Sequence, residues 1–426
     1  MNPAGGALDL ASRWLGASVV AASDESFGFK ENLLVPADPA FVPGRYDHRG
    51  EIVDGWETRR RRGEPGHDWA IIRLGVPGVI SDIDVDTSFF TGNFPPACRV
   101  EALGAEGYPS PAELASHPGW TDIVPRRDLA GDQHNVFPVA DAHRFTHVRL
   151  SIYPDGGVAR LRVHGQAVPD PRLWDGLTVD LASQEHGGLV VASSDSFYTS
   201  AALLNRPDRA RTMGEGWETS RRRNDGHDFA VIRLGVAGLA RQAVIDTAHF
   251  KYNASAEVVL SGHGGEPVPG PGREPGMGRG AGPVAGPGPE DGWAADRVPG
   301  PESPDWFPLL PRTRLQPDTR HVFGLAESAP VSWLRVDAYP DGGISRVRLT
   351  GVPDPAARRT AGLRWFNALP DGQAAECLAG HGLDDAAIAA AVAARPLTTT
   401  AVAGLPDENA RHVLSTWIID RQAASH

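Results

Sequence analysis

Apolar and polar residues alternate along much of the chain with the two-residue period of β-strands. Val148, Leu150 and Ile152 alternate with polar neighbours, and a Pro-Asp-Gly-Gly turn at 154–157 leads into a second apolar run. The same arrangement returns around the turn at 340–343. Turn residues between two alternating runs predict a β-hairpin at each place.

Polar motifs recur along the chain together with the apolar pattern. Gly-Trp-Glu-Thr followed by arginines occupies 55–62 and returns, with Ser220 before the arginines, at 216–223; Gly-His-Asp follows each time. Further matched pairs are 19–24 with 190–195, 70–76 with 230–236, Asp86-Thr87 with Asp246-Thr247, and 153–157 with 339–343. Because charged and aromatic residues recur as well as apolar spacing, the chain carries a duplicated unit that preserves more than its core.

The strands that the pattern predicts are short, and Gly and Pro interrupt them frequently. These features are typical of antiparallel sandwiches and jelly rolls, one for each copy. The end of the chain differs, because residues 382–395 form an alanine-rich run with Asp384 and Asp385 near its start, where acids suit the positive end of a helix. A further helix is expected over 411–422. We therefore predict an all-β protein with two tandem jelly rolls and a small helical C-terminal extension.

The spacing of matched residues locates an insertion. His67 and His227 are 160 positions apart, whereas Asp155 and Asp341 are 186 apart, so the second copy has gained 26 residues. The gain falls in the Gly/Pro tract at 262–304, which we expect to be a mobile surface loop because it has too few apolar residues for a core. The expected parts are an N-terminal segment (1–16), repeat 1 (17–168), repeat 2 (185–353) and the helical extension (362–426).

Composition argues against several classes of protein. A formal net charge of −12 over 426 residues disfavours a general nucleic-acid binder. The two cysteines, Cys98 and Cys377, are too few for a disulfide framework and are typical of a reducing compartment. No basic segment with an apolar run behind it opens the sequence, and no run approaches twenty apolar residues. We therefore expect a soluble cytoplasmic protein with neither a membrane nor a nucleic-acid partner.

The repeated polar residues include candidates for acid–base catalysis. A histidine beside carboxylates can act as general acid or base, or help to hold a metal ion. The candidates for these roles are His67, Asp86 and Glu57 in the first copy, and His227, Asp246, Glu218 and His249 in the second. The chain has no zinc-type Cys/His spacing and no phosphate-binding Gly loop. A divalent metal such as Mn²⁺ is left open.

Arginine suits a small carboxylate ligand, because its planar guanidinium donates paired hydrogen bonds. The candidates for ligand binding are Arg59, Arg60, Arg221, Arg222, Thr87, Thr247, Asn93, Trp56 and Trp217. Each type also has a structural interpretation. Arginine runs usually form solvated faces, tryptophans usually pack in or beside a core, and a histidine ahead of an apolar strand can make a structural hydrogen bond.

The motifs at 55–75 and 86–95, with their counterparts at 216–229 and 246–250, resemble the allantoicase family. The resemblance covers roughly residues 17–353 and is specific, since several motifs occur in the same order twice. It implies two jelly-roll repeats akin to galactose-binding-like modules. It also implies hydrolysis of allantoate to ureidoglycolate and urea in allantoin and purine degradation.

On this resemblance, an arginine of 59–62 or 221–223 would bind the substrate carboxylate. His67 or His227 would transfer protons with help from Asp86 or Asp246, and Glu57 or Glu218 is the alternative base. Two other functions stay open: a non-catalytic jelly-roll module for a small carboxylate or carbohydrate, and a purely structural duplication. The sequence also leaves open which repeat holds the site, whether chains share it, and whether the protein forms a homo-oligomer.

The two copies and the tail depart from a simple repeat. Phe89 stands where the second copy has His249, and the Thr-Gly-Asn-Phe-Pro of 91–95 is not repeated, which predicts that the copies are not equivalent. In the tail, residues 365–370 resemble the opening of ureidoimidazoline decarboxylase. About sixty residues are too few for that enzyme, so we interpret the tail as an accessory helical piece without decarboxylase activity.

Overall fold

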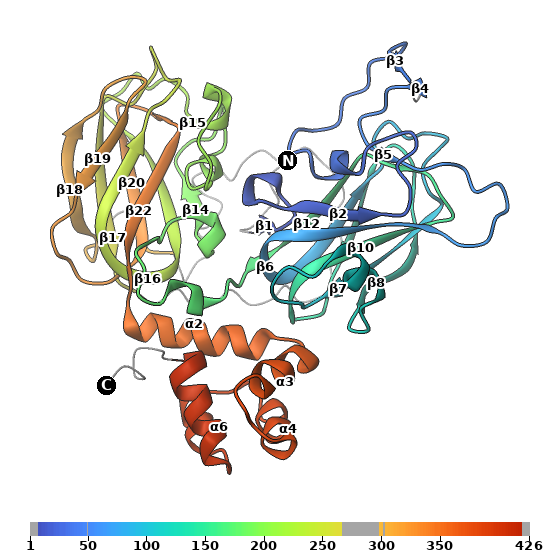
Figure 1. The fold of residues 1–426 in the computed structure, drawn as a ribbon. Helices are drawn as coiled ribbons and strands as arrows, with labels where there is room; N and C mark the ends of the chain where they lie inside the picture. The colour runs from blue at the N-terminus through green and yellow to red at the C-terminus, as the bar shows by residue number, and fades with distance from the viewer. Residues whose placement is uncertain (1–6, 49, 266–297, 301–302, 420–426) are drawn as a thin grey trace.

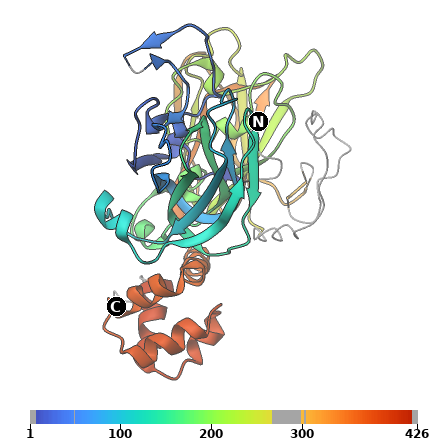
Figure 2. The same ribbon diagram turned by 90° about the vertical axis from the view of Figure 1, so that its right-hand side faces the viewer.

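The computed structural model describes residues 7–48, 50–265, 298–300 and 303–419. Two β-sandwiches lie side by side with a group of helices beneath them, and the helices keep this position when the molecule is turned (Figures 1 and 2). Each sandwich and the helical group has its own cluster of buried apolar side chains. Most of the Gly/Pro tract predicted as a mobile loop lies outside the described residues.

One long strand, β6 (Asp68–Asp86), organises the first sandwich. Its first half pairs with β10 (Arg144–Tyr153) and β2 (Ser18–Ala22), and its second half pairs with β12 (Arg160–Ala167) and β9 (His134–Pro138). The other elements are β1 (Leu8–Asp9), β3 (Tyr46–Asp47), β4 (Gly50–Glu51), β5 (Trp56–Glu57), β7 (Ala97–Leu103), α1 (Pro111–Ser116), β8 (Thr121–Asp128) and β11 (Gly157–Val158), with single 3₁₀ turns η1 (Arg13–Leu15) and η2 (Lys30–Leu34). Because one strand takes part in both layers, the layers close over a shared core as in a jelly roll.

The second sandwich repeats this plan around β16 (Asp228–Asp246). Its strand order β13-β22-β16-β20-β17-β18 corresponds element by element to β1-β12-β6-β10-β7-β8 of the first. The elements are β13 (Val179–Asp180), β14 (Leu189–Ser193), β15 (Trp217–Glu218), β17 (Glu257–His263), β18 (Phe307–Arg314), β19 (Arg320–Gly324), β20 (Val331–Tyr339), β21 (Gly343–Ile344) and β22 (Arg346–Pro353), with 3₁₀ turns η3 (Pro171–Trp174), η4 (Gln184–His186), η5 (Ala201–Leu203) and η6 (Met213–Glu215). The predicted all-β fold with two tandem jelly rolls is confirmed.

The two predicted hairpins are wrong in their pairing, although their strands exist. Val148, Leu150 and Ile152 are fully buried in β10 as the alternation requires. However, β10 and β12 lie on opposite sides of β6 and do not pair with each other. The residues after the turn, Gly157 and Val158, pair instead with β5. The long strand β6 hydrogen-bonds to both strands, and the segment after β10 passes from the first residue of β6 to its last: the Asp68 N–H donates to the Pro154 carbonyl, and the Ala159 N–H donates to the Asp86 carbonyl.

The helical tail begins earlier than predicted. Helix α2 (Pro355–Ala368) starts directly after β22, because the Asp354 side chain accepts hydrogen bonds from two backbone N–H groups of the first turn. The alanine-rich run forms α4 (Asp385–Ala393), capped by Asp384. The remaining helices are α3 (Asp371–Ala379), α5 (Thr399–Ala403) and α6 (Glu408–Val413), which continues as a π-helical turn η7 (Leu414–Ile419). The last predicted helix therefore starts before residue 411.

The tail packs against both the first sandwich and the linker between the repeats. Trp365 and Phe366, from the segment singled out in the sequence, are buried in the core of the tail. Gln373 donates to Glu106 of the first sandwich over 2.8 Å, and Arg358 pairs with Asp175 of the linker over 2.8 Å. These contacts connect the helices to the sandwiches through polar groups as well as through apolar packing.

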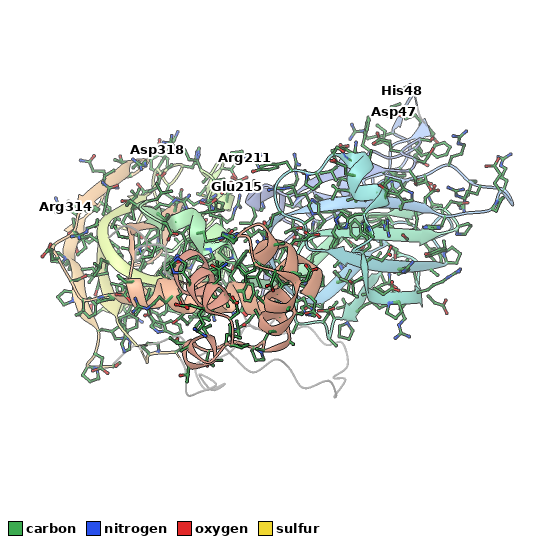
Figure 3. The ribbon with its side chains drawn as sticks, turned by 60° about the horizontal axis from the view of Figure 1, so that its bottom comes forward. Asp47, His48, Arg211, Glu215, Arg314 and Asp318 are labelled. Carbon is green, nitrogen blue, oxygen red and sulfur yellow. The ribbon has the colours of Figure 1, made fainter. Side chains whose placement is uncertain are left out.

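A stacking contact between aromatic and arginine side chains joins the two repeats directly. Trp14 of η1 lies under the guanidinium groups of Arg206 and Arg211, with the Arg206 carbon 3.5 Å from the ring centroid. Arg211 also pairs with Glu215 (2.8 Å), and both are labelled between the sandwiches in Figure 3. Within the described part of the chain, no helix is both long and apolar enough to span a membrane.

Candidate functional site

The repeated motifs gather at one end of each sandwich, around β5 and β15 (Figure 1). In the first repeat, Glu57 of β5 faces Gly157 of β11, and the Gly157 N–H donates to the carbonyl of Asn93 over 2.8 Å. A Cβ at position 157 would lie 1.9 Å from a ring carbon of Phe90, and one at Gly343 would lie 1.9 Å from the Asn253 carbonyl oxygen. Glycine at these turns therefore allows the loops that carry Asn93 and Asn253 to lie against the strands.

Trp56 and Trp217 support these loops from inside the fold. Both side chains are fully buried, and each indole N–H donates to a backbone carbonyl, Trp56 to Asp24 (2.8 Å) and Trp217 to Asp195 (2.9 Å). A buried indole with a satisfied N–H offers no surface to a ligand. Both tryptophans thus pack inside the fold, and their substrate-binding role stays a prediction.

The Asp-Thr pairs close a turn at the end of the long strand. Asp86 accepts from the Ser88 N–H (2.8 Å), and the buried Thr87 hydroxyl donates to the Ala130 carbonyl (2.7 Å). Asp246 and Thr247 make the corresponding bonds, to the Ala248 N–H and the Gln316 carbonyl. Because these side chains are buried and bonded within the turn, all four hold its shape. Their catalytic and binding roles stay predictions.

His249 and Phe89 occupy the next position of that turn. Both have positive φ, 70° and 67°, and the N–H of each donates over 2.7 Å to a carboxylate, that of Asp318 or Asp132. His249 Nε2 lies 3.0 Å from the Ala210 carbonyl, so that nitrogen carries the proton. The structure therefore places both residues at one backbone position, and in the second repeat the histidine holds a neighbouring loop.

The arginines of the repeated run differ in their contacts: some pair with buried aspartates, and others are exposed to solvent. Arg61 pairs with the buried Asp68 over 2.7 Å, and the Arg61 N–H donates to Asp155 Oδ2 over 2.7 Å. Arg222 makes the equivalent ion pair with Asp228, and its N–H donates to Asp341. These two arginines hold the loop.

Arg59 and Arg60 reach the surface beside that loop. Arg59 is exposed and lies 3.7 Å from Asp24. Arg60 is held by Asp155 (3.3 Å) and by the Gly92 carbonyl (3.1 Å), and about half of its side chain is accessible to solvent. Arg221, its counterpart, is exposed and has neither an ion pair nor a hydrogen bond to the described part of the chain. Arg60 and Arg221 are therefore placed to meet a ligand anion.

A glutamate and an asparagine form a pair in each repeat. Asn93 Nδ2 donates to Glu57 Oε1 over 2.8 Å, and Asn253 Nδ2 donates to Glu218 Oε1 over 2.6 Å. Both glutamates are half-buried. Burial raises the pKa of Glu57 above its ordinary value, while the Asn93 hydrogen bond and the charge of Arg60 act against this rise.

We call the set Glu57, Asn93 and Arg60, with Glu218, Asn253 and Arg221 in the second repeat, the Glu–Asn site. Asn93 occupies one carboxylate oxygen of Glu57, and the second has no hydrogen bond to any described residue. The tryptophan indoles and the threonine hydroxyls described above are bonded within the fold. Half-buried carboxyl groups with a raised pKa are typical of groups that exchange protons.

His67 and His227 lie on another face of the sandwich. Each stacks on the tyrosine that precedes the Pro-Asp-Gly-Gly turn, with ring centroids 4.6 Å apart for Tyr153 and 4.4 Å apart for Tyr339. His227 Nε2 is 2.8 Å from Asp337 Oδ1. The sequence motifs group His67 with Glu57 and Asp86, but the structure gives these three side chains different neighbours.

The sequence reasoning missed two sets of residues at this end of the fold. Asp155 and Asp341 anchor the arginine loops, and Tyr153 and Tyr339 stack on the histidines, whereas the sequence pattern indicates only a turn at all four. The sequence contains a sign of this role, because Tyr-Pro-Asp-Gly-Gly is identical in both copies. An ordinary turn would need only its Pro, Asp and Gly.

A metal centre does not fit this geometry. Among the residues that the structure describes, no three His, Cys, Asp or Glu side chains come together as metal ligands. The Glu–Asn site of repeat 1 offers one carboxylate and one amide, and the cation of Arg60 stands beside them. Such a donor set is too small and too positive for a divalent ion.

Known proteins match the chain over both repeats. The family model described as Allantoicase repeat matches residues 8–168 and 179–354. A probable allantoicase of Nocardia farcinica is 48% identical over 344 residues, which cover 80% of this chain and 93% of the relative. A probable allantoicase of Streptomyces coelicolor is 44% identical over 366 residues, covering 83% and 88%. A crystal structure of allantoicase from Saccharomyces cerevisiae is 31% identical, with a TM-score of 0.63, and covers 81% of this chain and 93% of that one. The chain belongs to the allantoicase family.

Proposed function

We propose that this protein hydrolyses allantoate to ureidoglycolate and urea at the Glu–Asn site. Allantoate is a carbon that bears one carboxylate and two ureido groups. Hydrolysis forms a C–O bond from water to that carbon and breaks one C–N bond, while a proton passes from the water to the leaving nitrogen. The reaction thus requires an anchor for the carboxylate and a group that accepts and then returns one proton.

The residues of repeat 1 match these two needs. Arg60 keeps half of its side chain accessible while Asp155 and a backbone carbonyl fix its position, so its guanidinium can bind the substrate carboxylate. Glu57, in its ionised form, can accept a proton from the attacking water, and its raised pKa makes it a stronger base than an ordinary carboxylate. The acid that results then returns the proton to the leaving nitrogen.

Asn93 positions the carboxyl group for this exchange. Its amide holds Glu57 Oε1 at 2.8 Å and leaves the other oxygen for water or substrate. Glu218 and Asn253 have the same relation in repeat 2. The recurrence of this pair beside an arginine in both repeats is the observation that carries the proposal, because Glu57 combines a half-buried carboxyl group with a neighbouring cation.

A urea-release assay on the purified full chain tests the proposal. Allantoate should yield urea and ureidoglycolate in equal amounts, with and without a chelator. The variant E57Q/E218Q should lose this activity and keep its fold, whereas E64Q, an exposed glutamate in the same loop, should be unaffected. Urea release by E57Q/E218Q at the wild-type rate would exclude the Glu–Asn site, and loss on chelation would restore the metal hypothesis.

The non-catalytic binding module is the less favoured function, since the relatives that match most of the chain are named as allantoicases. We also propose a cytoplasmic location and a homo-oligomeric state. Both described cysteines, Cys98 and Cys377, are free thiols, which suits a reducing compartment. Sedimentation of the purified chain would test the oligomeric state.

A further inference from the structure

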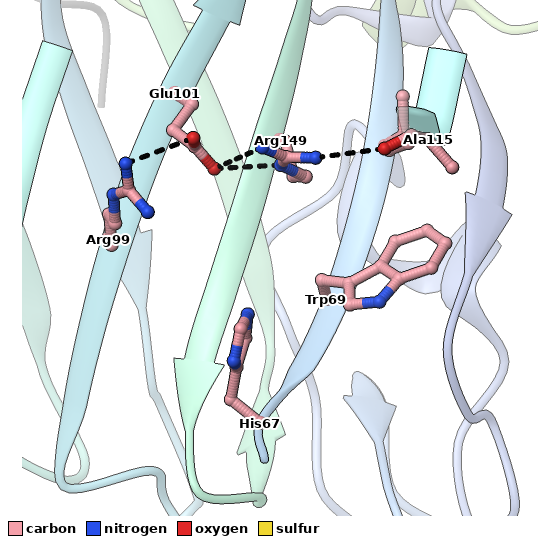
Figure 4. Close-up of a pocket in the computed structure, with 7 residues that line it drawn as sticks. His67, Trp69, Arg99, Glu101, Ala115 and Arg149 are labelled. Carbon is pink, nitrogen blue, oxygen red and sulfur yellow. Dashed lines mark hydrogen bonds and ion pairs between the residues drawn. The ribbon is translucent and has the colours of Figure 1, made fainter. Parts of the chain in front are cut away.

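The outer face of the first sandwich contains a cavity that the Glu–Asn site does not use. Its volume is about 260 Å³, and it lies over β6, β10 and β7 beside helix α1. Figure 4 shows the residues that line it: His67, Trp69, Ile71, Arg99, Glu101, Ala115 and Arg149. We call this cavity the sheet-face pocket.

Two guanidinium groups are fixed in the wall of the pocket. The nearly buried Glu101 accepts from Arg99 (3.1 Å) and from Arg149 (2.7 Å). Arg149 also donates to the Ala115 carbonyl (3.4 Å) and lies over the ring of Trp120. Arg99 also pairs with Asp122, its Nη2 donating over 2.9 Å. Glu101 and Asp122 therefore fix the two cations in place.

His67 adds an unpartnered polar group. Its ring extends towards the space beside Glu101 and Arg149 (Figure 4), and its ring nitrogens have no hydrogen bond to any described residue. Burial lowers the pKa of His67, and the charges of Arg61 and Arg149 lower it further. At neutral pH the ring is therefore uncharged and offers one N–H donor and one acceptor.

The second repeat shows that the fold itself does not require this arrangement. By strand register, Val259 replaces Arg99, Ser261 replaces Glu101, and Asp337 replaces Ser151. There Asp337 bonds to both His227 (2.8 Å) and Arg335 (2.7 Å). The histidine of repeat 2 is consequently paired, whereas that of repeat 1 is left for a ligand.

We propose that the sheet-face pocket of repeat 1 is a second binding site, which takes a small 2-hydroxy carboxylate. The ligand carboxylate would bind the N–H groups of Arg99 and Arg149 that Glu101 and Asp122 do not use. The hydroxyl group would bond with His67, and the ring of Trp69 would cover the apolar side. This site is separate from the proposed reaction at the Glu–Asn site.

Calorimetric titration of the full chain with glycolate tests the proposal, with glycolamide as a probe of the same shape and no charge. Glycolate should bind with one site per chain, and glycolamide at least about tenfold more weakly, since it lacks the charge that the two arginines recognise. The ring nitrogens of His67, followed by NMR, should report a raised pKa when glycolate binds. Equal affinity for the two probes would overturn the proposal.

Variants of the pocket residues test whether glycolate binds in the sheet-face pocket. S151D supplies the carboxylate that repeat 2 has, and R99V copies Val259, so each should weaken glycolate binding about tenfold or more and leave urea release from allantoate intact. The matched variant D337S in repeat 2 should bind glycolate like wild type. If E57Q/E218Q abolished binding while S151D and R99V did not, glycolate would occupy the Glu–Asn site and the pocket assignment would fail. Melting curves identify any variant that has not folded.

Discussion

The two repeats are alike at the loop end of the sandwich and unlike on the outer face of its first sheet. At the loop end both keep a glutamate bonded to an asparagine, a buried tryptophan and an arginine paired to a buried aspartate. On the sheet face, repeat 1 has an open pocket with an unpaired histidine, and repeat 2 has a closed His–Asp–Arg cluster. Duplication thus preserved the residues that organise the loops, while outward strand positions were free to diverge because they do not affect the core.

The largest effect is expected when the shared Glu–Asn pair is broken in both repeats. E57Q/E218Q should reduce kcat for urea release by about 10²–10⁴-fold, the usual contribution of acid–base catalysis. If the repeats are equivalent, each single variant should keep about half of the activity. If only repeat 1 reacts, E57Q alone should match the double variant and E218Q should match wild type. If neither the single variants nor the double variant lost activity, the reaction would not take place at the Glu–Asn site.

The buried tryptophans should be equally important to the two folds. Trp56→Ala and Trp217→Ala each remove a fully buried side chain and leave a backbone carbonyl without its donor. We expect each variant to lower the free energy of unfolding by about 3–5 kcal/mol, measured by denaturant titration. Trp120→Ala, a partly exposed ring, is the control and should lower it less. A loss below about 1 kcal/mol at either buried position would show that the loops do not depend on these side chains.

The asparagines should have a smaller effect that depends on position. Asn93→Ala removes the donor that holds Glu57, so the carboxyl group should move more freely and kcat should fall about tenfold, equivalent to about 1.4 kcal/mol. Asn93→Asp is a second variant, in which like charges should raise the pKa of Glu57 and shift the pH profile of urea release upwards. Comparison with Asn253→Ala would show which repeat is responsible. An unchanged profile in Asn93→Asp would contradict the positioning role.

The smallest effect concerns a His–Asp pair found only in repeat 1. His164 Nδ1 lies 2.7 Å from Asp82, and the position equivalent to Asp82 is Gln242 in repeat 2. Burial lowers the pKa of His164, but the hydrogen bond and charge of Asp82 outweigh burial and raise the pKa above 6.5. A raised folded pKa contributes stability that is present below about pH 6.5 and is lost as the pH rises through the folded value.

Asp82→Asn should therefore cost about 1 kcal/mol of unfolding free energy at pH 5.5 and less at pH 8.5. Gln242→Ala, at the corresponding position of repeat 2, should show no such pH dependence. Equal losses for Asp82→Asn at both pH values would mean that the charge of His164 is not involved.

The repeated motifs in the sequence point to residues that lie together in the structure, without separating their roles. Glu57, Asn93 and Arg60 were all named from the repeat, and the structure brings them together at one loop end. Trp56 and Thr87 were named for the same reason, although both are internal supports. A polar residue that binds a ligand and one that closes a turn look the same in the sequence, because both roles require that residue type at that position.

The sequence by itself determined the two sandwiches, since alternating apolar residues can bury only one face of a strand and the pattern occurs twice. It also determined the family, through motifs that recur in order. Only the tertiary structure decided that β10 and β12 flank β6 instead of pairing, because strand partners far apart in sequence compete for the same backbone groups. It alone separated His67 from Glu57 as well, since residues ten positions apart in a loop and strand are placed by the long-range register of the sheet.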